Sequence, residues 1–361
     1  MRVLGQELRT SLLSGPPRRD EQVGSSLPVP TKGTVRIAAL PGSCLSSGWQ
    51  APQNRAAMGR DTYPGPVSPE PEPTAGHAVD LAALSSEQRD LLDAWMPGYV
   101  VEHDLSWGLI ETTVLQVRHG GDRFVVKAGG PTDRHIKREL RAHREFLGPW
   151  TAIGRAPRLV HGDADAKLVV TGYLPGRLVE NDPTRLDPDT YRKAGELLRL
   201  LHAQPGVIDD AYHPREATAS LAWLDRPNRI DPPTKERLRA EIASWTSDPV
   251  LLVPTHGDWQ PRNWLIHDDE VFIIDFGRAD LRPAMTDFSR MAAKGFAHDK
   301  RLESAFLDGY GSDPREPVTW HRTRVREAIG TAAWAYGVGD EDFEALGHRM
   351  IADVLATSDY S

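Results

Sequence analysis

The sequence has very little cysteine and no long hydrophobic run. Cys44 is the only cysteine among 361 residues, so an intramolecular disulfide and a cysteine-rich zinc site are both excluded. No stretch of about 18 consecutive apolar residues occurs, which argues against a membrane-spanning helix. We therefore expect a protein of a reducing, cytoplasmic compartment with no membrane partner.

Basic residues are also fewer than acidic ones. The chain carries 43 Lys and Arg against 51 Asp and Glu, which gives a formal net charge of −8. This balance argues against the broad basic surface by which proteins hold nucleic acid, so no nucleic-acid partner is expected. An export signal is not expected either. Neither Arg18-Arg19 nor the segment 40–44 is accompanied by the apolar run of about 7–15 residues that a signal peptide needs.

Proline and glycine are concentrated in residues 1–80. The run 63–74 (YPGPVSPEPEPT) cannot hold a helix, because proline lacks the amide hydrogen and biases its neighbours toward extended backbone. We expect residues 1–80 to be disordered, since they bury too little apolar surface to offset the entropy cost of ordering. The alternative is that translation starts at Met58.

Ordered structure is expected from about residue 81. Ser85 and Gln88 form a capping-box pattern ahead of a first helix. The β-rich runs that follow are predicted as strands at 111–117, 123–127 and 167–174, with a His-Gly-Gly-Asp hairpin turn at 119–122. Apolar residues at helical spacing predict a helix over 132–150.

The remainder of the chain is mostly helical. Two short strands are predicted at 264–266 and 271–274, joined by an Asp-Asp turn, and helices at 191–202, 322–336 and 340–355. The predicted fold class is therefore α+β. A small antiparallel β-rich lobe with a hinge occupies 81–174, and a larger helical lobe occupies 175–361.

The densest group of chemically active residues lies at 255–287. It begins with a His-Gly-Asp sequence that ends at Asp258, continues to Asn263, and reaches Asp275 after the predicted hairpin. This spacing suits phosphoryl transfer. One carboxylate orients an attacking hydroxyl and accepts its proton, while an amide oxygen and a second carboxylate hold Mg²⁺ against the phosphates. The hairpin returns the two metal ligands to one place.

This segment resembles the catalytic loop and metal loop of the aminoglycoside phosphotransferase and choline kinase family, which is related to protein kinases. The family pattern H-G-D-x-x-x-x-N, followed by I-D and an aromatic residue, is intact here. The resemblance covers about residues 100–355 and implies a two-lobed protein-kinase-like fold with ATP as co-substrate. It implies that Asp258 is the catalytic base, that Asn263 of the same loop is a Mg²⁺ ligand, and that Asp275 is the other Mg²⁺ ligand.

Two residues in or near the catalytic loop are expected to support it, a third has two alternative roles, and a second His-Gly-Asp sequence is expected to have no catalytic role. His256 is expected to brace the catalytic loop, and Asp287 matches a family aspartate that is expected to be structural rather than catalytic. Arg262 either helps to neutralise the γ-phosphate or lies at the surface. A second His-Gly-Asp at 161–163 has Leu168 where the pattern requires Asn, so we expect an ordinary loop there.

The resemblance also implies a lysine that grips the α- and β-phosphates from a strand of the small lobe. Lys127 ends the predicted strand 123–127 and faces the same side as Val125 by alternation. Glu139, twelve residues later on the following helix, is its expected partner. Glu145 is the rival partner, although it falls near the end of that helix.

Two further segments are expected to contact ATP. The turn 106–111 is expected to cover the phosphates through backbone amides and the Ser106 hydroxyl, although it has one glycine where protein kinases have several. The hinge, with Thr171, Gly172 and Tyr173, is expected to hydrogen-bond adenine through its extended backbone.

The acceptor is expected to be a hydroxyl group of a small molecule, bound between the catalytic loop and the C-terminal helices. An acidic run at 340–344 near Trp334 and Tyr336 would complement a cationic, aminoglycoside-like antibiotic. The competing interpretation is a solvated helix start whose acids interact favourably with the helix dipole. Kinases of choline, of an amino alcohol or of a sugar are alternatives.

Two functions of other classes compete with a kinase. One is a non-catalytic kinase-like protein that binds nucleotide or antibiotic without turnover. The other is a metal-dependent phosphohydrolase built from His256, Asp258, His267 and Asp275, which gives Lys127 no role. The sequence leaves the choice between ATP and GTP and the oligomeric state open.

Overall fold

The computed structural model describes residues 83–106 and 112–358, which all fall in one compact unit. The segment 1–80 that we expect to be disordered, together with Cys44 and Met58, lies outside the described residues. Within the described part of the chain, no helix is both long and apolar enough to cross a membrane.

The β-rich part is a five-stranded antiparallel sheet with the order β1-β2-β3-β5-β4. Its strands are β1 (Val100–Asp104), β2 (Thr112–His119), β3 (Asp122–Gly129), β4 (Leu159–Asp163) and β5 (Leu168–Gly172). The predicted hairpin between β2 and β3 is confirmed. Gly120 and Gly121 form its turn with φ of 59° and 93°, a left-handed backbone that glycine adopts without steric cost.

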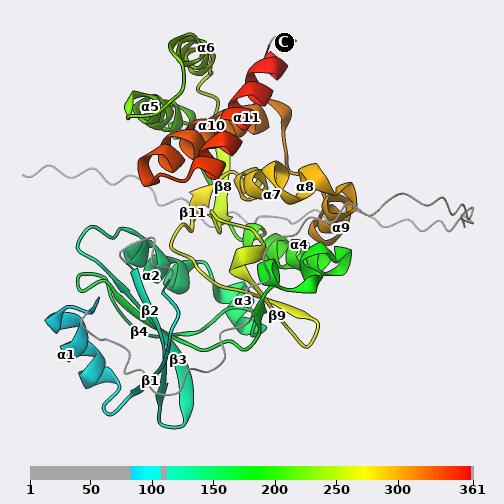
Figure 1. The fold of residues 1–361 in the computed structure, drawn as a ribbon. Helices are drawn as coiled ribbons and strands as arrows, with labels where there is room; N and C mark the ends of the chain where they lie inside the picture. The colour runs from blue at the N-terminus through cyan, green and yellow to red at the C-terminus, as the bar shows by residue number, and fades with distance from the viewer. Residues whose placement is uncertain (1–82, 107–111, 359–361) are drawn as a thin grey trace, which may run out of the picture. The chain divides into compact units, whose positions relative to one another are not determined.

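Two helices cover opposite faces of this sheet (Figure 1). The first, α1 (Ser86–Trp95), starts at the predicted capping box and buries Leu92 against Val126 and its neighbours. On the other face, α2 (His135–Glu145) packs Leu140 against Val169. Lys127 pairs across the strands with Val169. Its side chain therefore points to the α2 face, because directly opposed residues share a face of the sheet.

The predicted single helix over 132–150 is wrong. The structure has α2, followed by a separate short helix, α3 (Gly148–Ala152). Pro149 explains the break, since in a continuous helix its ring would clash with the carbonyl of Glu145, the last residue of α2. The start is also later than predicted, because the Asp133 carboxylate accepts hydrogen bonds from the first amides of α2 at 2.9 Å.

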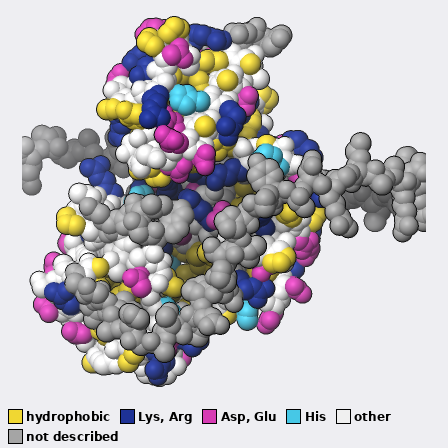
Figure 2. Space-filling model, in the orientation of Figure 1, with side chains coloured by type: hydrophobic (Ala, Val, Ile, Leu, Met, Phe, Trp, Pro, Cys, Tyr) yellow, Lys and Arg dark blue, Asp and Glu magenta, His cyan; other side chains and the backbone are white. Residues whose placement is uncertain are grey.

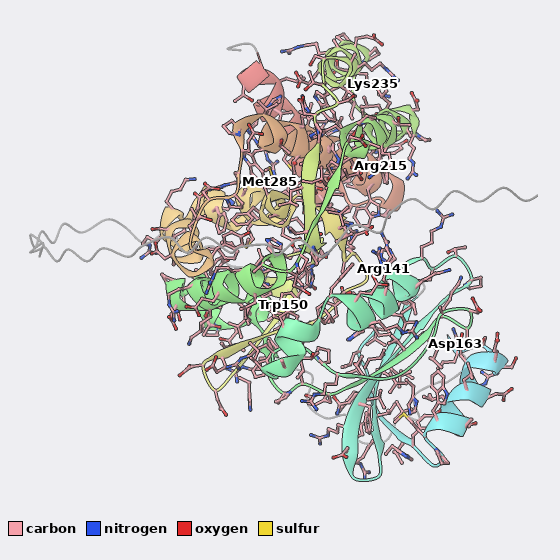
Figure 3. The ribbon with its side chains drawn as sticks, turned by 180° about the vertical axis from the view of Figure 1, so that it is seen from behind. Arg141, Trp150, Asp163, Arg215, Lys235 and Met285 are labelled. Atoms are coloured by element: carbon pink, nitrogen blue, oxygen red, sulfur yellow. The ribbon has the colours of Figure 1, made fainter. Side chains whose placement is uncertain are left out.

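The second His-Gly-Asp also differs from expectation. Residues 161–163 end the edge strand β4 instead of forming a loop. His161 stacks on Trp95 of α1 with ring centroids 5.1 Å apart, and Figure 3 shows Asp163 beside that helix. The Asp163 carboxylate accepts two local backbone hydrogen bonds in the turn to β5. Its role is thus to hold a turn.

The rest of the described chain is mainly helical, as predicted, and the α+β class is confirmed (Figure 1). Its helices are α4 (Pro188–His202), α5 (Tyr212–Asp225), α6 (Pro232–Ala243), α7 (Ser289–Ala293), α8 (Gly295–His298), α9 (Lys300–Tyr310), α10 (Pro317–Val338) and α11 (Glu341–Ser358). Its strands are β6 (Arg177–Leu178), β7 (Val207–Asp209), β8 (Val250–Thr255), β9 (Trp264–His267), β10 (Glu270–Ile273) and β11 (Asp280–Arg282). The predicted hairpin is β9–β10, with Asp268 and Asp269 in its turn at positive φ.

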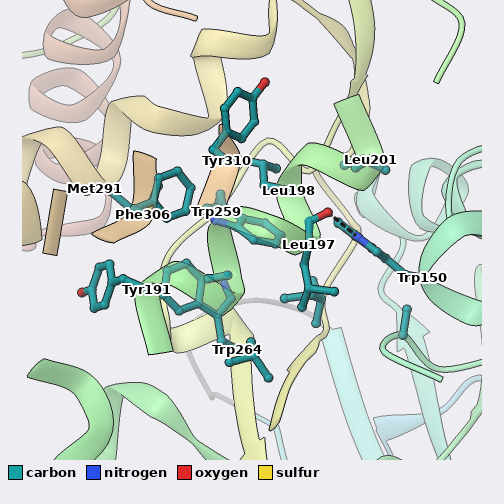
Figure 4. Close-up of a cluster of buried hydrophobic side chains, with 14 of the residues drawn as sticks. Trp150, Tyr191, Leu197, Leu198, Leu201, Trp259, Trp264, Met291, Phe306 and Tyr310 are labelled. Atoms are coloured by element: carbon teal, nitrogen blue, oxygen red, sulfur yellow. Dashed lines mark hydrogen bonds between the residues drawn. The ribbon is translucent and has the colours of Figure 1, made fainter. Parts of the chain in front are cut away.

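An aromatic core lies beneath the segment that carries the chemistry (Figure 4). Trp150, Trp259, Trp264 and Phe276 are fully buried in one cluster. The Trp150 indole N–H donates to the Leu197 carbonyl at 2.7 Å, which ties α3 to α4. Since Trp259 and Phe276 directly follow Asp258 and Asp275, this core fixes the backbone of both aspartates.

Candidate active site

The predicted ion pair in the small lobe is present. Lys127 Nζ lies 2.8 Å and 3.2 Å from the two carboxylate oxygens of Glu139, and 3.5 Å from Asp275 Oδ1. Glu145, the rival partner, pairs with Arg141 at the surface. Burial opposes the charge on Lys127, but the carboxylates of Glu139 and Asp275 outweigh it and raise the lysine pKa above its usual value. The structure thus brings the strand lysine, the helix glutamate and the metal-loop aspartate together.

The catalytic loop is held in place through its backbone. Gly257 has φ of 77°, and a Cβ there would lie 2.2 Å from the Arg278 carbonyl oxygen, so only glycine fits. The two oxygens of Asp287 accept hydrogen bonds from the N–H groups of His256 (2.8 Å) and Gly257 (2.6 Å). Buried His202 lies 3.0 Å from the same carboxylate. Asp287 therefore contacts the loop backbone and positions it.

His256 links the catalytic loop to the metal loop. Its Nε2 lies 3.1 Å from the Ile274 carbonyl, and its Nδ1 accepts the N–H of Asp258 at 3.2 Å. Both ring nitrogens are therefore occupied by backbone groups. This arrangement leaves His256 no position for a metal ion, which disfavours the phosphohydrolase interpretation. In the described ranges, no group of three or more His, Cys, Asp or Glu is arranged to hold a metal.

We expect Asp287→Ala to lower the free energy of unfolding by about 3–5 kcal/mol, because it leaves buried N–H groups and His202 without their partner. Urea unfolding measures this loss. Asp225→Ala is the matched control, since Asp225 forms an exposed pair with Arg239 and should cost less than about 1 kcal/mol. Equal effects of the two substitutions would refute the positioning role of Asp287.

Asp258 is buried and surrounded by donors. Its Oδ1 lies 2.6 Å from Gln260 Nε2 and 2.8 Å from Arg290 Nε, and its Oδ2 lies 2.7 Å from Arg262 and 3.2 Å from Asn263 Nδ2. Burial raises the pKa of the carboxyl group, but Arg290 and Arg262 more than compensate and hold that pKa well below its usual range. The carboxylate is therefore charged at neutral pH.

Asn263 and Asp275 offer two oxygen ligands. The Asn263 Nδ2 donates to the Asp258 carbonyl at 2.8 Å, which leaves its Oδ1 as an available acceptor, and Ile274 N–H donates to the Asn263 carbonyl at 3.1 Å. Asp275 has φ of 66°, a strained backbone for a non-glycine residue, and its side chain is 52% exposed. Hard oxygen ligands of this number fit Mg²⁺, which takes few protein ligands and completes its shell with phosphates and water.

The predicted phosphate turn is only partly described, since residues 107–111 lie outside the described ranges. The Ser106 hydroxyl accepts the N–H of Val114 at 3.0 Å, and the Ser106 N–H donates to Asp104 at 2.8 Å. Ser106 is therefore held by residues of β1 and β2, and its hydroxyl hydrogen is still available to a ligand.

The predicted hinge lies at the end of β5. Thr171 is buried within the strand. The N–H groups of Gly172 and Tyr173 donate to carbonyls of neighbouring segments at 2.9 Å and 3.1 Å. Among the described residues, none forms a hydrogen bond with the Leu174 N–H or the Tyr173 carbonyl. These two groups are therefore available to hydrogen-bond a ligand.

Two of the acidic residues at 340–344 make contacts within the fold. Asp340 accepts the Phe343 N–H at 3.0 Å and caps α11. Glu344 is buried and pairs with Arg229 at 3.1 Å. Glu341 and Asp342 are exposed. This pattern matches the solvated helix start that competed with a cationic acceptor site.

Sequence reasoning missed Arg290 and Gln260, which both contact Asp258 Oδ1. Gln260 belongs to the variable part of the catalytic-loop pattern, so its residue type carried no signal. Arg290 comes from α7, 32 positions beyond Asp258, and only the folded chain brings it back. Its one available signal was its position three residues after Asp287.

Comparisons with known proteins agree with this geometry. The sequence profile of the Phosphotransferase enzyme family matches residues 105–327, more than half of the chain. No curated protein matches the chain in sequence.

Among solved structures, a thermostable mutant of aminoglycoside phosphotransferase APH(4)-Ia in ternary complex with ADP and hygromycin B has a TM-score of 0.58 at 14% identity, covering 75% of this chain and 98% of that one. Choline kinase LicA from Streptococcus pneumoniae has a TM-score of 0.55 at 12% identity, with coverages of 76% and 100%. The gentamicin complex of APH(2")-IIa has a TM-score of 0.53 at 15% identity, with coverages of 74% and 96%. These likenesses confirm the kinase-like fold.

Proposed function

Since the chain belongs to the phosphotransferase enzyme family, we propose that it transfers the γ-phosphate of ATP to a hydroxyl group of a small molecule. The main support for this proposal is that Lys127 Nζ lies 2.8 Å from a carboxylate oxygen of Glu139 and 3.5 Å from one of Asp275. These residues come from a strand, a helix and a loop far apart in the sequence. A nucleotide site needs this arrangement, whereas an ordinary surface lysine does not.

The residues have distinct roles in the proposed reaction. Lys127, held by Glu139, offsets the charge of the α- and β-phosphates. The Leu174 N–H and the Tyr173 carbonyl bind the base edge, with Thr171 and Gly172 supporting this segment from β5. Ser106 offers its hydroxyl hydrogen to the phosphates.

Asp258 orients the acceptor hydroxyl for in-line attack on the γ-phosphorus, and it receives the proton as the new P–O bond forms and the bond to ADP breaks. Asn263 fixes the Asp258 carboxylate and, with Asp275, holds Mg²⁺. When bound, Mg²⁺ supplies positive charge that stabilises the phosphate oxygens. Arg262 neutralises negative charge at Asp258 and lies next to the metal ligand Asn263.

A non-catalytic binding protein is the weaker candidate. Such a protein would not require the contacts that hold Asp258 and Asn263 together, yet Asn263 Nδ2 lies within 3.2 Å of both the Asp258 carbonyl and its carboxylate. The acidic run, which would complement an aminoglycoside-like antibiotic, is engaged at the start of α11 through Asp340 and Glu344. The choice among antibiotic, choline-like amine and other hydroxyl compounds therefore depends on the cavity beside Asp258.

Nucleotide binding by the full chain tests the proposal. We expect Mg²⁺ and a non-hydrolysable ATP analogue to bind with a measurable calorimetric signal, and Lys127→Met to weaken binding by about tenfold or more. Lys235→Met in α6 is the control, and it should bind like the wild type. If the wild type binds no adenine or guanine nucleotide, or if both variants bind alike, the proposed function is wrong.

A further inference from the structure

A cavity of about 350 Å³ opens beside the catalytic aspartate. Gln260 and Arg290 line it, and both also contact Asp258 Oδ1. A molecule in this cavity therefore lies one side chain away from the group that orients the hydroxyl. The volume is near the lower end of the range of about 300–1,000 Å³ that small-molecule sites occupy. It suits a compact acceptor better than a multi-ring one.

Of the five Lys, Arg, Asp and Glu side chains that line this cavity, three are cationic. Arg185, Arg290 and Lys294 line it, against the carboxylates Glu180 and Asp299. Asp299 is already engaged, since it caps α9 and pairs with an exposed arginine at 2.7 Å. In Figure 2, Lys and Arg side chains gather on the visible face over α7.

Two of these cations lack a carboxylate of their own. In the described part of the chain, no Asp or Glu lies within 4.0 Å of Lys294 or Arg185. Burial lowers the pKa of Lys294, and the positive charges of Arg262 and Arg290 lower it further against the opposing effect of Glu180. Like charges gathered in a partly enclosed cavity repel one another, and an anionic ligand relieves that repulsion.

Tyr191 adds an unused hydrogen-bond donor to the same cavity. The residue is 2% exposed, and its ring packs on Trp264 and Phe296. Figure 4 shows its hydroxyl directed away from the aromatic core. Among the described residues, none forms a hydrogen bond with this hydroxyl, and Tyr191 lines the cavity. Burial raises the pKa of Tyr191 to about 12, so it stays protonated and can donate.

Resting on the kinase function proposed above, we propose that the acceptor is a compact hydroxyl compound that carries a carboxylate or phosphate group. Lys294 and Arg290 bind this anionic group, and the Tyr191 hydroxyl donates to it. Met291 and Leu302 provide an apolar wall for the rest of the molecule. A polycationic acceptor would have to place its own positive charges beside these cations.

The same arrangement explains how a hydroxyl reaches Asp258. The carboxylate already has four donors within 3.2 Å, about as many as its lone pairs accommodate. A hydroxyl can approach Oδ1 only when one donor moves away. An anionic group in the cavity offers Arg290 an alternative partner, so binding of the acceptor frees a position on Asp258.

Four small three-carbon probes test the charge preference: glycerate, glycerol phosphate, glycerol and the amine serinol. Calorimetry with the full chain, saturated with Mg²⁺ and a non-hydrolysable ATP analogue, measures their affinities. We expect one or both anions to bind more tightly than glycerol and serinol, and the tighter anion identifies carboxylate or phosphate as the recognised group. Lys294→Gln should weaken anion binding by about tenfold. Tyr191→Phe should weaken anion binding without loss of nucleotide affinity. Lys235→Gln should leave anion binding unchanged.

Failure of this inference is distinguishable from failure of the proposed function. The inference is overturned if serinol or glycerol binds as tightly as both anions, if neither anion binds, or if Lys294→Gln binds the anions as well as the wild type. In each of these cases the full chain still binds the nucleotide, so the proposed kinase function is not refuted. Absence of nucleotide binding in the same titration would instead refute the kinase function itself.

Discussion

Replacement of Asp258 by asparagine is expected to lower kcat by about a hundredfold to ten-thousandfold, the usual contribution of a positioned acid–base group. The nucleotide affinity should change by less than about threefold, because the contacts proposed for ATP lie on Lys127 and Asp275. The neutral amide keeps the size of the side chain but cannot receive the proton of the acceptor hydroxyl. It also turns a donor toward Arg290 or Arg262, which disturbs the loop. The measurement is single-turnover phosphate transfer alongside calorimetry.

The second His-Gly-Asp provides the matched control for this substitution. Asp163 follows the same dipeptide, but it only accepts backbone hydrogen bonds in a turn, and asparagine can make these too. Asp163→Asn should therefore retain wild-type turnover. If Asp258→Asn retains a tenth or more of the wild-type kcat, Asp258 is not the group that handles the proton.

Asp275→Ala is expected to abolish the Mg²⁺ dependence of nucleotide binding and to weaken binding by about a hundredfold, because it removes one of two protein ligands together with the second anionic neighbour of Lys127. Chelation of Mg²⁺ from the wild type should produce the same weak affinity. Addition of Mg²⁺ to the variant should then have no effect in calorimetry.

Backbone strain could confound this result, since Asp275 has φ of 66° and alanine is disfavoured there. Asp268 has φ of 48° in the turn of the β9–β10 hairpin, which makes Asp268→Ala a control with similar strain and no metal role. Mg²⁺-dependent binding that persists in Asp275→Ala, or an equal loss in Asp268→Ala, would show that Asp275 is not a metal ligand.

Local patterns in the sequence predicted several elements of the fold. The β2–β3 hairpin, the β9–β10 hairpin and the capping box at Ser85 each depend on residues a few positions apart, and all three are present in the structure. The break between α2 and α3 was also encoded locally, at Pro149. It was overlooked because the apolar spacing continues across it.

A contact between two distant segments was predictable only where a family motif contained both of the contacting residues. The pairing of Lys127 with Glu139 follows from a strand, the helix after it and the family resemblance, although β3 continues two residues past Lys127. The contact of Arg290 with Asp258, and the cavity lined by Lys294 and Tyr191, depend on how α4, α7 and α8 pack together. No periodicity or spacing in the sequence encodes that packing. The acidic run attracted attention because its charges are adjacent in sequence, although Glu344 is neutralised by Arg229 in the fold.

The central claim is that Lys127, Asn263 and Asp275 converge on one metal-bound triphosphate. A crystal structure of the full chain with Mn²⁺ in place of Mg²⁺ and a non-hydrolysable ATP analogue tests it most directly, because anomalous scattering locates the metal. We predict a Mn²⁺ peak between the side chains of Asn263 and Asp275, with Lys127 on the α- and β-phosphates and the γ-phosphate facing Asp258. A nucleotide bound elsewhere, or Mn²⁺ held by other residues while Asn263 and Asp275 contact neither metal nor phosphate, would contradict it.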